Sequence, residues 1–574
     1  MSRSSRASHR WTAALAGLAA VLLAGACSTV PSSSPTIQIT QAASRPTTNV
    51  GIEPLPPEEG ATPDEVVRGF IDAAASTVRG HPVARQYLTA QAARTWSDET
   101  GITVITDVAA VPTDSGVVQV TATLVGAVDP HGVFTVGSQR AYSRTFALQQ
   151  VKKQWRIINP PDGLLLLQPD FERLYDQLNA FFIDPTGQRV VPDPRYLITG
   201  QAQPNALVQR LLDGPSPALV HGVRNPLQGA ELRRSVTITP RGVTVDLTGI
   251  GTPPTPVLSE ICAQIVWTLN QLSLRNVEVL VDGQPVDIDG VPSVQSIGDW
   301  SSFDPEEVPV GAVGHYVDGG ALHRTVDGKP VNGPAGTGQY GLTAAAISAD
   351  ERTGELSGVA ATTGGPAPAL MVGSYGGDLT QVLVTGGTLS APTVASTRPE
   401  FWVVRDGSEV VRVTVGGQPQ PVDVPALPGL GRVQSLRLSP DGVRAAVVVD
   451  GTLYVGTVVR SDDGGVTLGS LQAIAPSLTL VSDVAWDSSG SLVVLAGDAG
   501  QDREVPYQVG VDGWGLESVS TAGLPGQPTE LGDAPGRQLL VVAGGTIWQQ
   551  SGGTWTTLVR GQEPVPGSAP FYPL

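Results

Sequence analysis

Few side chains in this sequence have the types and spacing that catalysis or metal binding requires. None of the six histidines lies in an HExxH arrangement, and none stands near a cysteine at a metal-binding spacing. His315 and His323 are eight residues apart in glycine-rich sequence, which favours a loop over a pair of ligands. The sequence therefore predicts no catalytic residue, no metal, no cofactor and no enzymatic activity.

Two other motifs could suggest chemistry but have simpler interpretations. The GxGxxG pattern at Gly336–Gly341 would need a strand before it and a helix after it to bind a phosphate. It follows Asn332-Gly333-Pro334 instead, so we expect a loop. The acidic residues Asp304, Glu306 and Glu307 are interpreted as a solvated linker between domains rather than as paired catalytic carboxylates.

The most informative single residue is Cys27, which ends the first apolar run. The chain starts with Arg3, Arg6 and Arg10 and no acid, and Trp11–Ala26 carries no charge. A basic start, a short apolar core and small residues before a cleavage site are typical of a secretory signal. Sixteen residues are few for a membrane span, which needs about 20.

Residues Leu23-Ala24-Gly25-Ala26-Cys27 resemble a bacterial lipobox, with Ala24 where leucine is commonest. The resemblance implies that signal peptidase II cuts between Ala26 and Cys27. It also implies a diacylglycerol on the Cys27 thiol and an acyl group, such as palmitate, on the new amine. Two or more acyl chains anchor a protein stably. We therefore expect anchoring to the outer face of the cell membrane; the alternative is an ordinary signal with a chance cysteine.

Charge and composition limit the classes of partner and fold that this chain can have. Removing three arginines with the signal takes the net charge from −18 to −21, which disfavours nucleic acid as a partner. The 574 residues suggest three or four domains, and the many glycines and prolines favour turn-rich β structure. Cys262 has no partner for a disulfide, and its helical context predicts a buried, unreactive side chain.

The first part of the mature chain is expected to be a tether followed by an α+β domain. Residues 27–61 contain the lipidated cysteine and a flexible stretch rich in Ser, Thr and Pro. Thr62-Pro63-Asp64-Glu65 predicts a helix start with a capping box, and a second short helix is expected over 83–93. Strand-like runs follow at 101–109, 117–128, 141–151 and 154–158. Helices before a long antiparallel sheet resemble the NTF2-like fold, which we assign to residues 62–170.

A second α+β domain is expected at residues 171–300. Its pattern is a strand at 178–183, a helix at 204–212, a hairpin, a helix from Thr255 and a strand at 277–281. The ordered segments LLDGP, VTVDLT, IVWTLNQ and VEVLVDGQPV resemble the GerMN domain. That resemblance implies an extracytoplasmic interaction module without demonstrated chemistry.

Residues 301–574 repeat a strand, polar turn and apolar strand. The repeat is clearest at Ser439-Pro440-Asp441-Gly442, and successive repeats are about 44–48 residues apart. Periods in the forties with about four strands each predict β-propeller blades. Five blades are recognisable, and a sixth could combine residues 311–335 with Phe571–Leu574. A β-sandwich or irregular β domain is the alternative.

The whole arrangement resembles the LpqB lipoproteins of actinobacteria. The resemblance implies an accessory protein that binds the outer sensor region of the Mtr two-component histidine kinase and modulates signalling linked to cell-wall homeostasis and division. It carries over no binding residue. Two alternatives remain: a propeller protein that binds or hydrolyses cell-wall glycan, and a carrier that holds a lipid or small molecule in the NTF2-like domain.

Overall fold

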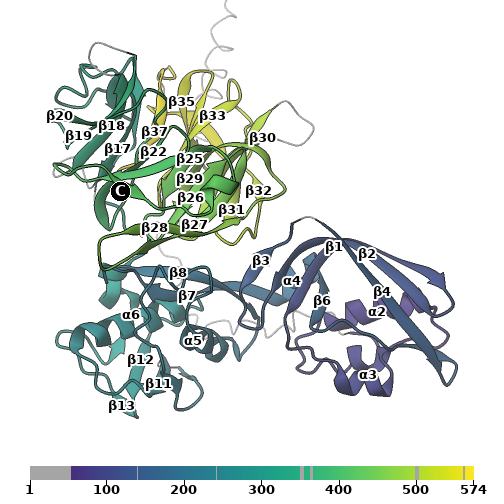
Figure 1. Ribbon diagram of the computed structural model, residues 1–574. Coiled ribbons are helices and arrows are strands. Elements are labelled where there is room, and N and C mark those ends of the chain that lie inside the picture. Colours follow the sequence, from purple (N-terminus) through teal and green to yellow (C-terminus); the bar gives the residue numbers. More distant parts are fainter. Residues whose placement is uncertain are drawn as a thin grey trace, which may run out of the picture. The chain divides into compact units, whose positions relative to one another are not determined.

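The protein is described here from a computed structural model (Figure 1). The structure describes residues 54–138, 140–240, 242–309, 311–348, 354–361, 366–497, 503–559 and 563–574. These residues belong to one compact unit. Cys27 and Ala26, with the expected tether up to residue 53, lie outside the described residues.

The N-terminal part begins with the expected helix, α2 (Pro63–Ala74). Glu65 accepts a hydrogen bond from the Thr62 backbone N–H at 2.8 Å, as the capping-box motif predicts. The helix expected over 83–93 is instead split into a 3-10 turn, η1 (Ala84–Tyr87), and α3 (Ala90–Thr95). Thr89 causes the break, since its hydroxyl caps α3 by accepting from the Ala92 N–H.

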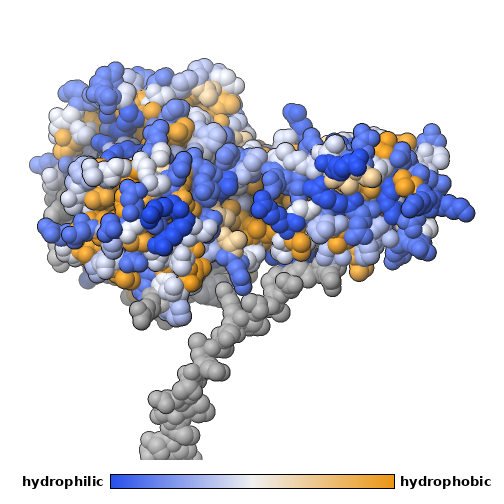
Figure 2. Space-filling view, turned by 90° about the horizontal axis from the view of Figure 1, so that it is seen from below, coloured by the Kyte–Doolittle hydropathy of each residue, from blue (hydrophilic) through white to orange (hydrophobic). Residues whose placement is uncertain are grey.

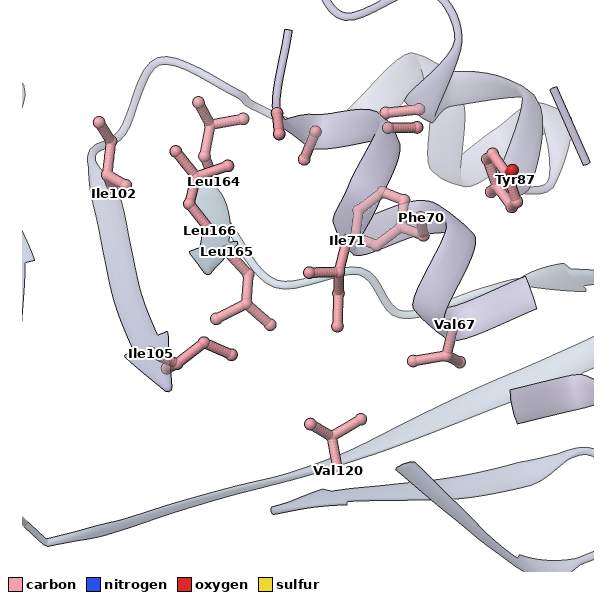
Figure 3. Packing of buried hydrophobic residues seen from close by; sticks show 14 of the residues in the cluster. Val67, Phe70, Ile71, Tyr87, Ile102, Ile105, Val120, Leu164, Leu165 and Leu166 are labelled. Atoms are coloured by element: carbon pink, nitrogen blue, oxygen red, sulfur yellow. The ribbon is translucent and has the colours of Figure 1, made fainter. Parts of the chain in front are cut away.

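These helices pack on a six-stranded sheet of order β5-β4-β2-β1-β6, with β3 paired to β2. Its strands are β1 (Ile102–Asp114), β2 (Val117–Val128), β3 (Phe134–Val136), β4 (Ala141–Val151), β5 (Gln154–Ile157) and β6 (Leu164–Leu167). Figure 3 shows the core, in which Phe70 and Ile71 of α2 lie with Leu165 of β6. All three side chains are buried, and each such burial contributes about 1.5–3 kcal/mol.

A long hairpin links this core to the next one. Helix α4 (Gln168–Leu174) leads into β7 (Tyr175–Ile183), which pairs antiparallel with β8 (Val190–Ile198). Tyr196 at one end of the hairpin packs in the N-terminal core, whereas Phe182 at the other end packs in the middle core. The hairpin is therefore shared by two cores and connects them without a flexible joint of its own.

The middle part is an α+β unit in which a helix connects two parallel strands. Strand β11 (Gly242–Thr248) pairs in parallel with β12 (Val277–Val281), and α6 (Thr255–Asn270) is the crossover between them. Helix α5 (Gln203–Asp213) ends at Gly214, whose φ of 96° a glycine adopts without strain. The remaining elements are β9 (Glu231–Leu232), β10 (Thr237–Thr239), β13 (Gln284–Pro285), β14 (Val294–Gln295) and η2 (Ile297–Phe303).

The C-terminal part consists of six sheets, as expected for a propeller (Figure 1). Five have four strands each in sequential order. They are β17 (Leu342–Ser348), β18 (Glu355–Ala361), β19 (Pro368–Ser374) and β20 (Leu379–Val384); β21 (Thr393–Ala395), β22 (Arg398–Arg405), β23 (Glu409–Val413) and β24 (Gln420–Val422); β25 (Val433–Leu438), β26 (Arg444–Val449), β27 (Thr452–Arg460) and β28 (Val466–Ala473); β29 (Thr479–Ser488), β30 (Ser491–Gly497), β31 (Glu504–Gly510) and β32 (Glu517–Ser518); β33 (Pro528–Gly532), β34 (Leu540–Ala543), β35 (Thr546–Ser551) and β36 (Thr554–Thr557). A further short turn, η3 (Leu427–Gly429), follows β24.

The sixth sheet closes the ring with both ends of the propeller sequence. Strand β37 (Ser568–Phe571) pairs with β15 (His315–Asp318), which pairs with β16 (Ala321–Arg324). The innermost strands then contact one another in a complete circle, from β17 through β21, β25, β29 and β33 to β37 and back. Closure protects the sheet edges and makes the propeller a rigid platform.

The surface mixes side-chain types. Figure 2 shows hydrophobic residues, singly and in small groups, interspersed with hydrophilic ones over the visible face. No helix among the described residues has both the length and the apolar character that a bilayer crossing demands.

Candidate functional site

Cys262, the cysteine of the middle part, is buried in the fold. Cys262 lies on α6, is fully buried, and contacts Gln295 through a 3.7 Å N–H···S hydrogen bond. Burial raises the pKa of its thiol to about 12, so the reactive thiolate is disfavoured. The prediction that Cys262 is buried is confirmed, and its lack of reactivity stays a prediction.

His315 and His323 are not in a loop, and that expectation is wrong. They lie on the paired strands β15 and β16, because the glycines beside them form turns at the strand ends. His315 is fully buried, its Nε2 is 2.9 Å from the Tyr375 hydroxyl, and burial lowers its pKa to about 4. Within the described ranges, no group of three or more His, Cys, Asp or Glu side chains could hold a metal. The Gly336–Gly341 motif lies between β16 and β17, which confirms a blade loop.

The candidate site is instead the junction where the propeller meets the rest of the chain. Its centre is Trp514, in the loop between β31 and β32. The indole meets three aromatic rings of the N-terminal core: its centroid is 5.1 Å from Phe134, 5.1 Å from Phe171 and 5.7 Å from Tyr196. The edge-on geometry favours attraction beyond simple area burial. We call these four residues the aromatic latch.

A hydrogen bond fixes the aromatic latch. The Tyr196 hydroxyl donates to Asp512 Oδ2 at 2.9 Å, and the backbone N–H of Trp514 donates to Asp512 Oδ1 at 3.1 Å. Burial raises the pKa of Asp512, and the hydrogen bonds from Trp514 and Tyr196 offset part of that rise. Gly513 is required between them, because a Cβ there would lie 2.3 Å from the Ile474 carbonyl oxygen. The chain therefore builds one precise loop to hold Trp514 in place.

A second contact brings strands β26 and β27 onto the middle part. Arg444 donates to the Pro192 carbonyl at 2.6 Å, and Thr457 donates to the Ala218 carbonyl at 2.7 Å. Asp441 lies beside Arg444 at 4.0 Å, and both side chains are buried. Removing one member of a buried ion pair leaves the other charge buried without a partner, which is strongly destabilising. The interface is therefore stable only when both Asp441 and Arg444 are present.

The acidic run 304–307 forms a third contact, and the expectation of a solvated linker is wrong for Glu306. Both Glu306 carboxylate oxygens accept from the Ser489 N–H at 3.0 Å, and the Ser489 hydroxyl donates to the Pro305 carbonyl at 2.8 Å. Burial raises the pKa of Glu306 to about 7. Glu307 is more exposed and pairs with Arg189 at 2.7 Å. The run thus fastens the middle part to a propeller turn.

The centre of the propeller is largely filled by the end of the chain. The Leu574 N–H donates to the Ile347 carbonyl at 3.0 Å, and the Tyr572 hydroxyl donates to the Gln538 carbonyl at 2.7 Å. A cavity lined by inner-strand residues and by Phe571, Tyr572 and Leu574 measures about 70 Å³. Sites for drug-sized ligands usually measure about 300–1,000 Å³, so this cavity offers little room for a sugar chain.

Sequence reasoning did not identify the aromatic latch. The Val511–Leu516 segment reads as an ordinary glycine-rich turn, and nothing in its spacing identifies Phe134, 380 residues away, as a partner. An available signal was a large aromatic side chain placed between two glycines, where the backbone can approach another surface closely.

Comparison with known proteins shows three family models along the chain. Residues 56–172 match "Lipoprotein LpqB, N-terminal domain", residues 179–287 match "Sporulation and spore germination", and residues 320–573 match "Lipoprotein LpqB beta-propeller domain".

Curated relatives are similar over nearly the whole length. The Lipoprotein LpqB of Rhodococcus opacus is 31% identical over 91% of this chain and 90% of its own. That of Mycobacterium ulcerans is 34% identical over 86% and 88%, and that of Mycobacterium tuberculosis is 31% identical over 96% and 97%. Among solved structures, TolB from Acinetobacter baumannii aligns with 82% of each chain at 10% identity and a TM-score of 0.27.

Proposed function

Because the chain belongs to the LpqB lipoprotein family, we propose that it is a membrane-anchored extracytoplasmic accessory protein that binds the outer sensor region of a two-component histidine kinase. Cys27 is the proposed anchor, carrying a diacylglycerol on its sulfur and an acyl group on its amine after cleavage from Ala26. The protein then modulates signalling linked to cell-wall homeostasis and division.

The proposal is supported by the family membership together with the contacts that join the propeller to the N-terminal and middle parts. The aromatic latch, the Arg444 contact and the Glu306 contact hold the parts of the chain together. A body of this kind presents a fixed surface to a partner and loses little entropy when it binds. The filled propeller centre supports binding by outer surfaces over the alternative of glycan binding or hydrolysis in a central channel.

The mechanism we propose is a population shift. A sensor with two conformations responds to an accessory protein only by the difference in the free energies with which that protein binds each one. Moving a sensor from 10% to 90% in one state takes a difference of about 2.6 kcal/mol, or about 80-fold in affinity. The protein needs no reaction of its own to produce that effect.

A direct binding measurement tests this function. The fragment 51–574 corresponds to the compact unit and lacks the signal and the lipid. We expect it to bind the purified outer region of the kinase saturably at micromolar or lower concentration in calorimetry. The outer region of an unrelated sensor kinase serves as the control. Absence of association at high micromolar concentration would contradict the proposal.

A further inference from the structure

The N-terminal part contains two adjoining cavities along the outer side of α2, with volumes of about 490 and 360 Å³. Both are lined by Arg68 and Asp72, which lie one helical turn apart. We call the two cavities together the α2 groove. The larger one is also lined by Leu55, Glu58, Glu65 and Tyr87.

One side of the α2 groove is apolar and held in position. Leu55 is 71% exposed. Its backbone is nevertheless held in place, because the Leu55 carbonyl accepts a hydrogen bond from the Tyr87 hydroxyl at 3.0 Å. The Tyr87 ring in turn lies directly on α2, since a Cβ on Gly69 would be only 2.6 Å from the ring. An exposed leucine on an ordered support is poised to cover an apolar side chain of another molecule.

The other side of the α2 groove carries an excess of negative charge. Four carboxylates line the larger cavity, those of Glu58, Glu65, Asp72 and Asp170. Of the two arginines there, Arg173 pairs with Asp170 at 2.7 Å and Arg68 donates to the Ala110 carbonyl at 3.3 Å. These negative charges affect one another. Burial is the main cause of the raised pKa of Asp72, and the nearby Asp170 carboxylate is the second. A cation is the complementary charge.

The position of the α2 groove in the sequence limits what can reach it. Its wall begins at Pro54, the first described residue, 27 residues after Cys27. Those residues span at most about 97 Å when fully extended. An occupant is therefore within that distance of the proposed anchor. The anionic lipid surface itself is electrostatically unsuited to an acidic groove.

We propose that the α2 groove docks a positively charged protein segment, in which a Lys or Arg lies beside an apolar side chain, from the extracytoplasmic region of the membrane partner. The cation lies among Glu58, Asp72 and their neighbours, and the apolar side chain covers Leu55. This inference rests on the proposed function, because it assigns the contact surface for that same partner.

The test uses the full-length acylated protein reconstituted in vesicles with the full-length kinase. A photoreactive benzoylphenylalanine replaces Leu55, and captured kinase peptides are sequenced by mass spectrometry. Affinity is measured in parallel for Asp72→Lys and for the matched control Glu59→Lys. Glu59 is also exposed but lines neither cavity. Thermal unfolding verifies that both variants are folded.

We expect a kinase peptide containing Lys or Arg to be captured at Leu55. We also expect Asp72→Lys to weaken binding about tenfold, with a larger effect at low salt, and Glu59→Lys to stay within about twofold. Kinase binding that is equal in both variants, or capture of lipid alone, would overturn the α2 groove and leave the proposed function intact. Failure of the unmodified protein to bind the kinase would overturn both.

Discussion

Replacing Trp514 with alanine should release the N-terminal part from the propeller while leaving both folded. Truncating a fully buried tryptophan costs about 3–5 kcal/mol. Trp514 is half-buried, so the lower value of about 3 kcal/mol applies, with the three ring contacts contributing much of it. A loss of about 3 kcal/mol corresponds to an opening equilibrium about 150-fold more favourable.

Native-state hydrogen exchange measures that opening segment by segment. In Trp514→Ala we expect amides of β3 and of the Asp193–Ile198 half of β8 to exchange about 100-fold faster. The middle helix α6 should be unaffected, because its contacts lie away from the aromatic latch. Trp548→Ala is the matched control, since Trp548 is a half-buried tryptophan that packs against a cluster of propeller residues. Equal exchange in wild type and Trp514→Ala, or the same change in Trp548→Ala, would refute the reasoning.

Three further predictions concern the other contacts. Arg444→Met leaves Asp441 buried without its cation and should lower the free energy of unfolding by about 3–5 kcal/mol in urea titrations; a loss below 1 kcal/mol would count against the docking role. Because the pKa of Glu306 in the folded protein, about 7, exceeds the usual value near 4.5, its contribution to stability is complete below about pH 4.5 and is lost as pH rises through 7. Glu306→Gln should therefore reduce the fall in the free energy of unfolding between pH 5 and 8, measured by urea titration, by about 2 kcal/mol, and an unchanged pH dependence would exclude Glu306 as its source. Cys27→Ser should remove stable membrane association, which detergent partitioning checks; partitioning like that of the wild type would contradict the anchor.

The elements that local sequence patterns control were predictable. The Thr62–Glu65 capping box marked the start of α2, and the regular polar turns located the blades. The sequence also suggested that a sixth blade could combine residues 311–335 with Phe571–Leu574; the closing strand is β37 (Ser568–Phe571), which shares only Phe571 with that segment.

The contacts between parts of the chain were not predictable, for a physical reason. Whether Glu306 is solvated depends on the Ser489 N–H, which lies 183 residues further along the chain. Whether Trp514 lies on the surface or against Phe134 depends on how two separately folded cores meet. Periodicity and turn chemistry report local structure only, so such long-range pairs leave no pattern in a single sequence.

Lipid anchoring through Cys27 is tested by the mass of the N-terminal peptide of the protein extracted from membranes of its own cells. We expect a chain that starts at Cys27 and carries both a diacylglycerol and an acyl group. A chain that retains residues 1–26, or one with an unmodified thiol at position 27, would contradict it.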